Sequence, residues 1–482
     1  MKKAILWLVL FWPSITLAFD IDIFKRGQEE DRAKITVQGE GRFRARDVGA
    51  KGLGKEGEII DSLGASLKRE TALTERLDIK LSSTVVKDLA VMGVIRIGNE
   101  GKEEPEDLKV ESREILLGFH RPLVDLIAGR FNLTLTPLTM KEWDPQDNAG
   151  PHSPGYTTRL SGIQGGRLDG LLDEPRLFEG VKIALQPTPG LDLIGFGVRP
   201  RGEAYRRDVY GGRFKAVFAY LPAESAIELG LTYLKLKDRK VKESNLPPPV
   251  ESEIYGLDFL LPVEDLFVIE GEFVRGEWDR DLLDPEDKMR EGIAGWVGVK
   301  GDLDFLGMPS LEGNIAYIRV DPDFPDTTAS YTVKTYTPNR TGVRVQAGYK
   351  VPVKRIAANG YYKYLEEIEP SSKGGNTLTS FQIARGELTL YLRYNLSLLV
   401  GYEYRWTDRT DDPWTKEPDV ISDERIDWAR GIFSLEGIYR FSPRAVFNVR
   451  AEFIDHQDEA DRPGQQVDYQ ATILSAEFGL EF

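Results

Sequence analysis

Three histidines, His120, His152 and His456, are the side chains of this chain that are available as general bases at neutral pH. His152 is followed by Ser153, and His456 follows Asp455 in an acidic stretch. None of these spacings fixes a nucleophile or a metal ion beside the imidazole. The chain has no cysteine, which excludes thiolate chemistry and disulfides. We therefore predict no enzyme activity, no cofactor and no metal site, and a hydrolase is the least favoured alternative.

Charged side chains recur at every second position of several segments. In residues 34–46, Arg42, Arg44 and Arg46 alternate with apolar or small residues. A period of two places the arginines on one face of a β-strand. Charge that faces the hydrocarbon midplane of a membrane costs about 2–4 kcal/mol per side chain, so this face should line an aqueous interior. The predicted pore-lining set is Arg42, Arg44, Arg46, Arg130, Arg344, Lys350, Arg385, Arg393, Arg405, Arg440, Arg450, Glu387 and Glu403.

Two interpretations of this charged face remain open. The side chains could form a cross-strand network of ion pairs that stiffens a wide barrel. They could instead form a ladder of arginines that guides a solute. An excess of cations in a channel raises the local anion concentration, so the second interpretation predicts a mild preference for anions.

The segment 136–175 is several times longer than an ordinary connection and is rich in Gly and Pro. We expect this loop to fold into the bore and to set its constriction, and an exposed surface loop is the alternative. Trp143 would offer an apolar face for a sugar, and Lys141, Asp144 and Asn148 would offer hydrogen bonds.

These residues must be positioned by strands, because the same alternation recurs along the chain. It is clearest in residues 76–85, 341–351, 381–394, 396–406, 433–441 and 444–453. Nine short turns, each followed by a longer polar loop, are expected at residues 87–88, 121–122, 188–190, 222–223, 264–265, 305–308, 352–354, 395 and 442–443. Short turns on one side and long loops on the other are typical of outer-membrane barrels. The fold class is therefore predicted to be all-β, a single-domain transmembrane antiparallel β-barrel of about 18–20 strands.

Both ends of the chain support this prediction. Residues 1–18 have the basic start, short apolar run and small-residue end of a secretory signal peptide, so we expect cleavage after Ala18. Residues 19–33 are then a periplasmic N-terminal segment, and residues 34–482 form the barrel. The last strand alternates up to Phe482, and this pattern resembles the terminal signature that the barrel assembly machinery reads in bacterial outer-membrane proteins.

Three short motifs resemble a known family. Gly129-Arg130-Phe131 closes one strand, Trp143-Asp144 lies in the long loop, and Phe178-Glu179-Gly180-Val181 opens the next strand. Together they resemble alginate-export-type porins, and Gly-Arg-Phe is also similar to a run in phosphate-selective porins. The resemblance implies a bacterial outer-membrane porin.

The formal net charge of −15 with 29% charged residues looks like that of a soluble protein, but only alternate residues of a barrel face lipid. The leading prediction is an outer-membrane porin of a Gram-negative-type bacterium for diffusion of small hydrophilic solutes, either sugars or anions. The alternatives are an export channel for an anionic exopolysaccharide such as alginate, and an outer-membrane hydrolase. The expected partners are outer-membrane lipid, lipopolysaccharide, the assembly machinery through Phe482, and the solute, and no nucleic acid is expected.

Overall fold

The structure is a computed structural model of the whole chain. It describes residues 20–22, 34–51, 58–60, 66–68, 71–86, 88–98, 109–133, 135–136, 138–139, 177–200, 207–220, 225–238, 249–264, 266–279, 281–282, 284, 289–304, 307–308, 310–325, 339–351, 355–369, 378, 380–408, 428–458 and 469–481.

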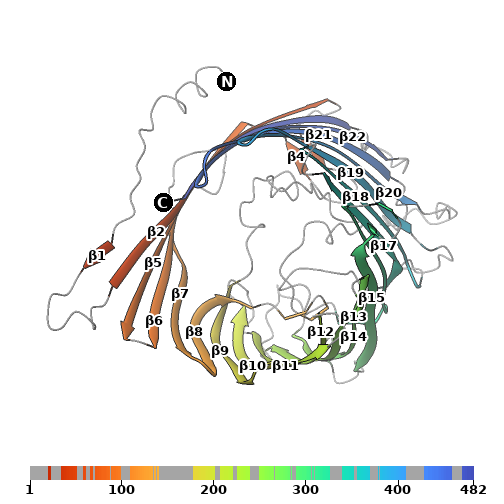
Figure 1. Cartoon of the computed structure of the whole chain (residues 1–482). Helices are drawn as coiled ribbons and strands as arrows, with labels where there is room; N and C mark the ends of the chain where they lie inside the picture. Colours follow the sequence, from red (N-terminus) through yellow and green to blue (C-terminus); the bar gives the residue numbers. More distant parts are fainter. Residues whose placement is uncertain are drawn as a thin grey trace.

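Twenty strands of the described residues form one closed ring, which Figure 1 shows from one end. The main sheet holds 21 strands, of which β1 (Asp20–Asp22) pairs only with β2 and leaves 20 in the ring. Each ring strand pairs antiparallel with its sequence neighbours, and β2 pairs with both β5 and β23, which closes the ring. The predicted all-β antiparallel barrel is confirmed. Its strands are β2 (Lys34–Lys51), β5 (Thr71–Val86), β6 (Leu89–Gly98), β7 (Lys109–Arg121), β8 (Val124–Asn132), β9 (Leu177–Thr188), β10 (Leu191–Pro200), β11 (Arg207–Tyr220), β12 (Ser225–Asp238), β13 (Glu251–Val263), β14 (Phe267–Asp279), β15 (Arg290–Asp302), β16 (Leu311–Val320), β17 (Arg340–Val351), β18 (Ile356–Glu366), β19 (Ser380–Arg393), β20 (Leu396–Asp408), β21 (Trp428–Ser442), β22 (Ala445–Asp458) and β23 (Tyr469–Glu481).

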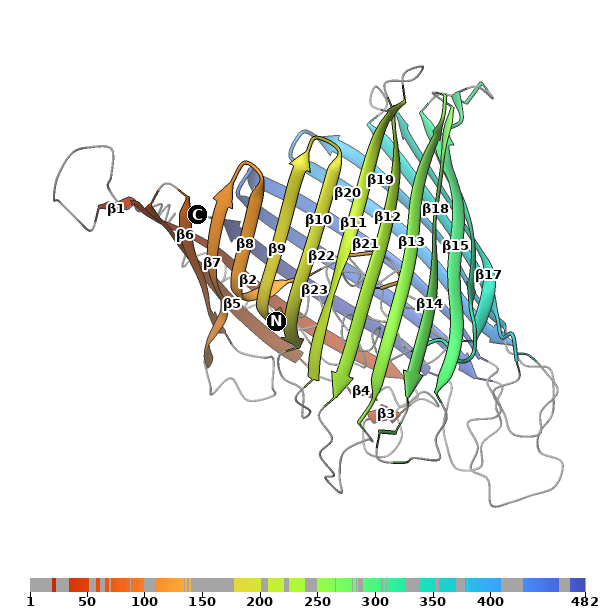
Figure 2. The same cartoon turned by 90° about the horizontal axis from the view of Figure 1, so that it is seen from below.

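All nine predicted short turns join consecutive ring strands, beginning with β5–β6 and ending with β21–β22. They lie on one rim, which we call the turn end, and the strand ends that the longer connections join lie on the opposite rim, the loop end (Figure 2). A separate two-strand hairpin, β3 (Glu58–Ile60) with β4 (Ser66–Lys68), lies in the connection from β2 to β5. The strand count follows from the turns, because nine hairpins plus β2 and β23 give 20 strands.

One face of the ring strands carries exposed apolar side chains. Leu231, Leu257 and Phe273 stand opposite one another on β12, β13 and β14, and each exposes more than two fifths of its surface. Residues that pair directly across antiparallel strands point to the same face. This is the outer face, and an apolar outer band is what a barrel surrounded by hydrocarbon requires.

The described residues contain no helix that is long and apolar enough to cross a membrane.

The seam between β2 and β23 follows the predicted alternation. Leu474 is exposed on the outer face, whereas Ile473 and Glu477 are buried on the inner face. Arg44 pairs with Glu477, so Arg42, Arg44 and Arg46 occupy inner-face register positions. Three predicted features lie outside the described residues: the signal peptide, most of segment 19–33, and Phe482 with its role in assembly.

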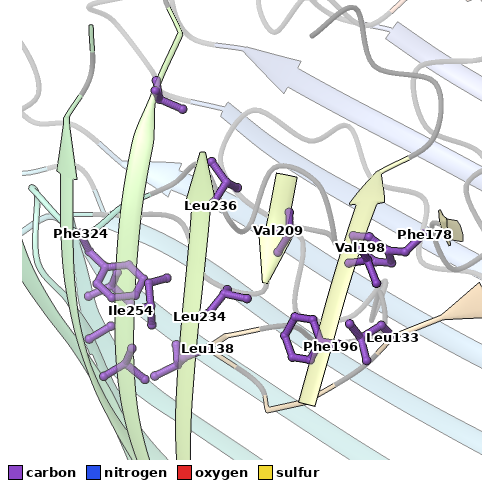
Figure 3. Close-up of a cluster of buried hydrophobic side chains, with 14 of the residues drawn as sticks. Leu133, Leu138, Phe178, Phe196, Val198, Val209, Leu234, Leu236, Ile254 and Phe324 are labelled. Atoms are coloured by element: carbon purple, nitrogen blue, oxygen red, sulfur yellow. The ribbon is translucent and has the colours of Figure 1, made fainter. Parts of the chain in front are cut away.

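The inner face of β8–β16 is apolar toward the loop end. Figure 3 shows Leu133 and Leu138, from the connection after β8, against side chains of the neighbouring strands, and Phe324, from the connection after β16, joins the same cluster. We call these residues the inner apolar cluster. Its buried members are Phe131, Leu133, Leu138, Phe178, Phe196, Val198, Val209, Leu234, Leu236, Val250, Ile254, Val274, Ala294, Ile318, Val320 and Phe324. Connecting segments therefore fill part of the bore.

Candidate functional site

The first residues after β8 turn into the barrel, and we call residues 133–139 the inward segment. Leu133, Thr136, Leu138 and Thr139 are all buried. Thr136 Oγ1 donates a hydrogen bond to Glu272 Oε1 at 2.5 Å, and the Leu138 amide donates to Glu272 Oε2 at 3.0 Å. One carboxylate thus holds both a side chain and a backbone group of the inward segment.

Glu272 lies near the middle of β14, between the two rims. Its side chain also accepts a hydrogen bond from Trp296 Nε1 of β15 at 3.4 Å. Arg213, near the middle of β11, donates from Nη1 to the Leu135 carbonyl at 3.2 Å. Contacts with two mid-strand side chains place the inward segment about halfway through the barrel. This segment narrows the bore on the β11–β15 side.

Thr136, Leu138 and Thr139 belong to the predicted loop 136–175, and they lie inside the bore. Lys141, Trp143, Asp144 and Asn148, the predicted constriction residues, lie outside the described residues. For the greater part of that loop, the inward fold stays a prediction.

The opposite wall, on β19–β23, carries buried charges on its inner face, and we call it the charged wall. Arg385 donates to Glu387 at 2.7 Å, Arg405 donates to Glu403, and Arg450 contacts Glu452 at 2.8 Å.

These three pairs run along strands rather than across them, because each joins residues two apart. Arg450 also reaches across to Glu436 on the neighbouring strand at 3.3 Å. A carboxylate therefore neutralises each of these three guanidinium groups, and the geometry matches a network of ion pairs more closely than a free ladder.

The register places most of the predicted pore-lining side chains on the inner face. Arg344 stands opposite the buried Lys363, and Arg405 stands opposite the buried Arg430. Arg440 lies on the inner face near the turn end and is exposed. Lys350 occupies an inner-face register position, and its side chain, like those of Arg42, Arg44 and Arg46, is outside the described set.

The prediction that Arg130 lines the pore is wrong. It stands opposite Glu179 and Ile115, and Ile115 is an exposed residue of the outer apolar band. Arg130 therefore lies on the outer face, where its Nε is 4.0 Å from a carboxylate oxygen of Glu179. The neighbouring Phe131 takes the inner position and joins the inner apolar cluster.

The prediction for Arg393 is also wrong. A register shift between Tyr391 and Arg393 changes the alternation at the end of β19. Arg393 consequently pairs with Leu396, which stands opposite Tyr439 of the outer face. The bulge removes Arg393 from the inner face that a strict period of two had predicted.

The structure describes two of the three histidines, His120 and His456. His120 Nδ1 is 2.6 Å from Asp125 Oδ1 on the inner face near the turn end. His456 is buried and accepts a hydrogen bond from Arg430 Nε at 3.3 Å. His152 lies outside the described residues. Within the part of the chain that the structure describes, no group of three metal-ligating side chains is found.

Sequence reasoning missed Glu272, Arg213 and Trp296. The signal was present, because Glu270, Glu272 and Val274 alternate with Ile269, Gly271 and Phe273 in β14. A carboxylate at alternate positions in an otherwise apolar strand indicates an inner-face group with a partner. The partner segment itself showed no periodicity that would have identified it.

No protein-family model matches the chain, and no curated protein matches it. Solved structures that are similar to this chain include three proteins of Pseudomonas aeruginosa. OccK5 (OpdH) is 9% identical, with 92% of this chain and 98% of that chain covered and a TM-score of 0.48. OpdL is 10% identical over 93% and 99%, with a TM-score of 0.45, and OprD is 12% identical over 96% and 99%, with a TM-score of 0.42. The resemblance to alginate-export-type and phosphate-selective porins stays a prediction, and the proposals below rest on this chain's own residues.

Proposed function

We propose that this protein is an outer-membrane channel for the diffusion of small hydrophilic solutes in a Gram-negative-type bacterium. One observation carries the proposal: the 20-strand ring is apolar outside and charged on its inner wall, with the inward segment lying halfway along the bore. Only an aqueous interior accounts for the inner charges in a barrel surrounded by lipid.

A solute would pass between the inward segment and the charged wall. Because Arg385, Arg405 and Arg450 already contact carboxylates, the wall presents alternating charge rather than a positive field. Weak contacts of both signs suit uncharged hydrophilic solutes and let them leave as readily as they enter. Export of an anionic polysaccharide would use successive guanidinium groups that are free to bind carboxylates. These three pairs do not provide such groups.

The outer face toward the loop end supports a second contact in this proposal, with lipopolysaccharide. Lys235 lies 2.8 Å from Glu251 and Lys237 lies 2.8 Å from the same carboxyl group, above the apolar band. Such a polar belt fits the level of lipid head groups. Assembly through Phe482 belongs to the same proposal and is supported by the alternation of the sequence that ends at Phe482.

Single-channel recording in planar bilayers tests the channel proposal. Because the chain has no cysteine, a single introduced thiol is a specific probe. Gln346 is exposed on the inner face of β17, and its neighbour Val345 is exposed on the outer face. A charged, membrane-impermeant thiol reagent should reduce the current of Gln346→Cys and leave that of Val345→Cys unchanged. Absence of channels, or equal effects on the two variants, would contradict the proposal.

A further inference from the structure

A cavity of about 310 Å³ opens on the inner face of β7–β11 near the turn end. Its polar lining consists of Arg121, Asp125, Gln186, Asp192, Arg213 and Lys215. This volume is at the lower end of the range for small-molecule sites, about 300–1,000 Å³. The cavity therefore has room for a solute of single-ring size.

Each cation of the lining already has a carboxylate partner. Arg121 is 3.1 Å from Asp88, Arg213 is 2.5 Å from Asp258, and Lys215 is 2.6 Å from Glu228. None of these three carboxylates belongs to the lining. An anionic solute would consequently find no uncompensated positive charge in the cavity.

The two carboxylates of the lining also have partners, but neither partner is an arginine or a lysine. Asp125 contacts His120, and Asp192 accepts a hydrogen bond from the neutral amide of Gln186 at 3.1 Å. A carboxylate accepts from several donors, so Asp192 retains acceptor capacity toward the cavity. Hydroxyl groups donate strong, charge-assisted hydrogen bonds to such an acceptor.

Arg213 supplies the complementary donor. Its Nη2 contacts Asp258 and its Nη1 donates to the Leu135 carbonyl. Its Nε is buried and has no protein hydrogen-bond partner in the described part of the chain. An atom without accessible surface cannot reach a solute, so the donors that remain for an occupant are the second hydrogens of the two Nη groups, on a guanidinium group that lines the cavity.

We propose that this cavity is a binding subsite for a small polyhydroxylated solute without negative charge, such as a single sugar ring. A hydroxyl oxygen would accept from an Nη group of Arg213, and another hydroxyl would donate to Asp192. This inference rests on the proposed channel function. In that channel, the subsite binds a permeating solute transiently near the turn end of the bore. It selects sugars from the two predicted solute classes, sugars and anions.

The test is saturation-transfer NMR on the folded protein in detergent micelles, with glucose, glucuronate and glucosamine as probes. These probes share one ring and differ in charge, so their order of affinity reports the electrostatics of the cavity. We expect glucose and glucosamine each to bind more tightly than glucuronate, because the lining offers no uncompensated cation to a carboxylate. Asp192→Asn and Arg213→Lys should each weaken glucose binding about tenfold, the cost of one charge-assisted hydrogen bond. Lys237→Gln, on the outer face, is the matched control and should bind as the unmodified protein does.

Heat-modified gel mobility verifies that each variant is folded, and Asp192→Asn carries the test if Arg213→Lys does not fold. Tighter binding of glucuronate than of glucose, or unchanged glucose binding by Asp192→Asn, would overturn the subsite. A protein that conducts ions but does not bind glucose refutes this inference alone. A protein that binds glucose through Asp192 and forms no channels refutes the proposed function and leaves the site.

Discussion

Thr136 and Glu272 are joined by a hydrogen bond of 2.5 Å although 136 positions separate them in the chain. The bond connects the beginning of the longest connection to the middle of β14, and the Leu138 amide binds the other oxygen of the same carboxyl group. Both Glu272 and Thr136 are buried, so water does not replace either partner easily. Glu272 is therefore the main polar anchor that keeps the inward segment in the bore.

Replacing Glu272 by Gln should loosen the inward segment. The substitution replaces the charge-assisted hydrogen bonds from the Leu138 amide and the Thr136 hydroxyl by weaker neutral ones, which costs about 1–3 kcal/mol. Because about 1.4 kcal/mol changes an equilibrium tenfold, conformations with the segment displaced become more populated. Single-channel recordings should show a larger mean conductance and more frequent transitions.

Glu270→Gln is the control for that variant, because Glu270 lies on the same face of β14 two residues nearer the turn end. Equal conductance of Glu272→Gln and the unmodified protein, with both folded, would mean that the inward segment does not narrow the path.

Gly230→Ala tests the second polar contact of the inward segment, which Arg213 makes. Gly230 pairs directly with Asp258, and a β-carbon at position 230 would meet the Asp258 carboxylate. Displacement of this carboxylate releases Arg213, which holds the Leu135 carbonyl. We expect a conductance change in the same direction as that of Glu272→Gln and a small loss of stability, because a side chain rather than backbone must move.

The control for this substitution is Gly437→Ala, since nothing lies within 4 Å of an added β-carbon there. A conductance of Gly230→Ala that equals the Gly437→Ala value would show that Arg213 does not position the inward segment.

The sequence alone predicted about 18–20 strands, and the ring has 20, because the nine turns are marked by their own residues and by shifts in the alternation. Arg385, Arg405 and Arg450, which the alternation predicted to lie on one face, occupy inner-face register positions, where charged and apolar side chains are mixed. On β8 the same rule failed. There the inner face carries Ile127 and Phe131, which pack on a segment folded into the barrel, and Arg130 on the outer face pairs with Glu179.

The rule that charge faces the lumen assumes an empty, hydrated lumen and an outer face that lies wholly in hydrocarbon. Neither assumption holds near the loop end of β8. Packing of a remote segment such as Leu133 on Phe178 depends on tertiary contacts that carry no local period. The same reason explains why Glu272 was not identified as an anchor.

Arg450→Ala should strongly destabilise the barrel. Arg450 is buried and contacts Glu436 at 3.3 Å and Glu452 at 2.8 Å, so its removal leaves two buried carboxylates without this cation. Removal of one partner from a buried ion pair costs about 3–5 kcal/mol. Urea unfolding in lipid vesicles, followed by tryptophan fluorescence, measures this loss.

Arg440→Ala serves as the reference for Arg450→Ala, because the exposed Arg440 lies on the same inner wall. Its free energy of unfolding should change by about 0.5 kcal/mol or less. Equal stability of the two variants would argue that the charged wall does not stabilise the fold.

Arg130→Gln and Arg385→Gln separate the outer face from the inner face by ion selectivity. Arg385 lies on the inner wall and contacts Glu387 at 2.7 Å, so its neutralisation leaves an excess of negative charge along the path. Cations are then enriched in the bore, and the reversal potential in a potassium chloride gradient should shift toward cation preference. Arg130 lies on the outer face beside Glu179, at a position that permeating ions do not approach, so Arg130→Gln should keep the reversal potential of the unmodified protein. Equal shifts in the two variants would contradict the assigned register of β8, because only a side chain that faces the bore acts on ions at this range through water and salt.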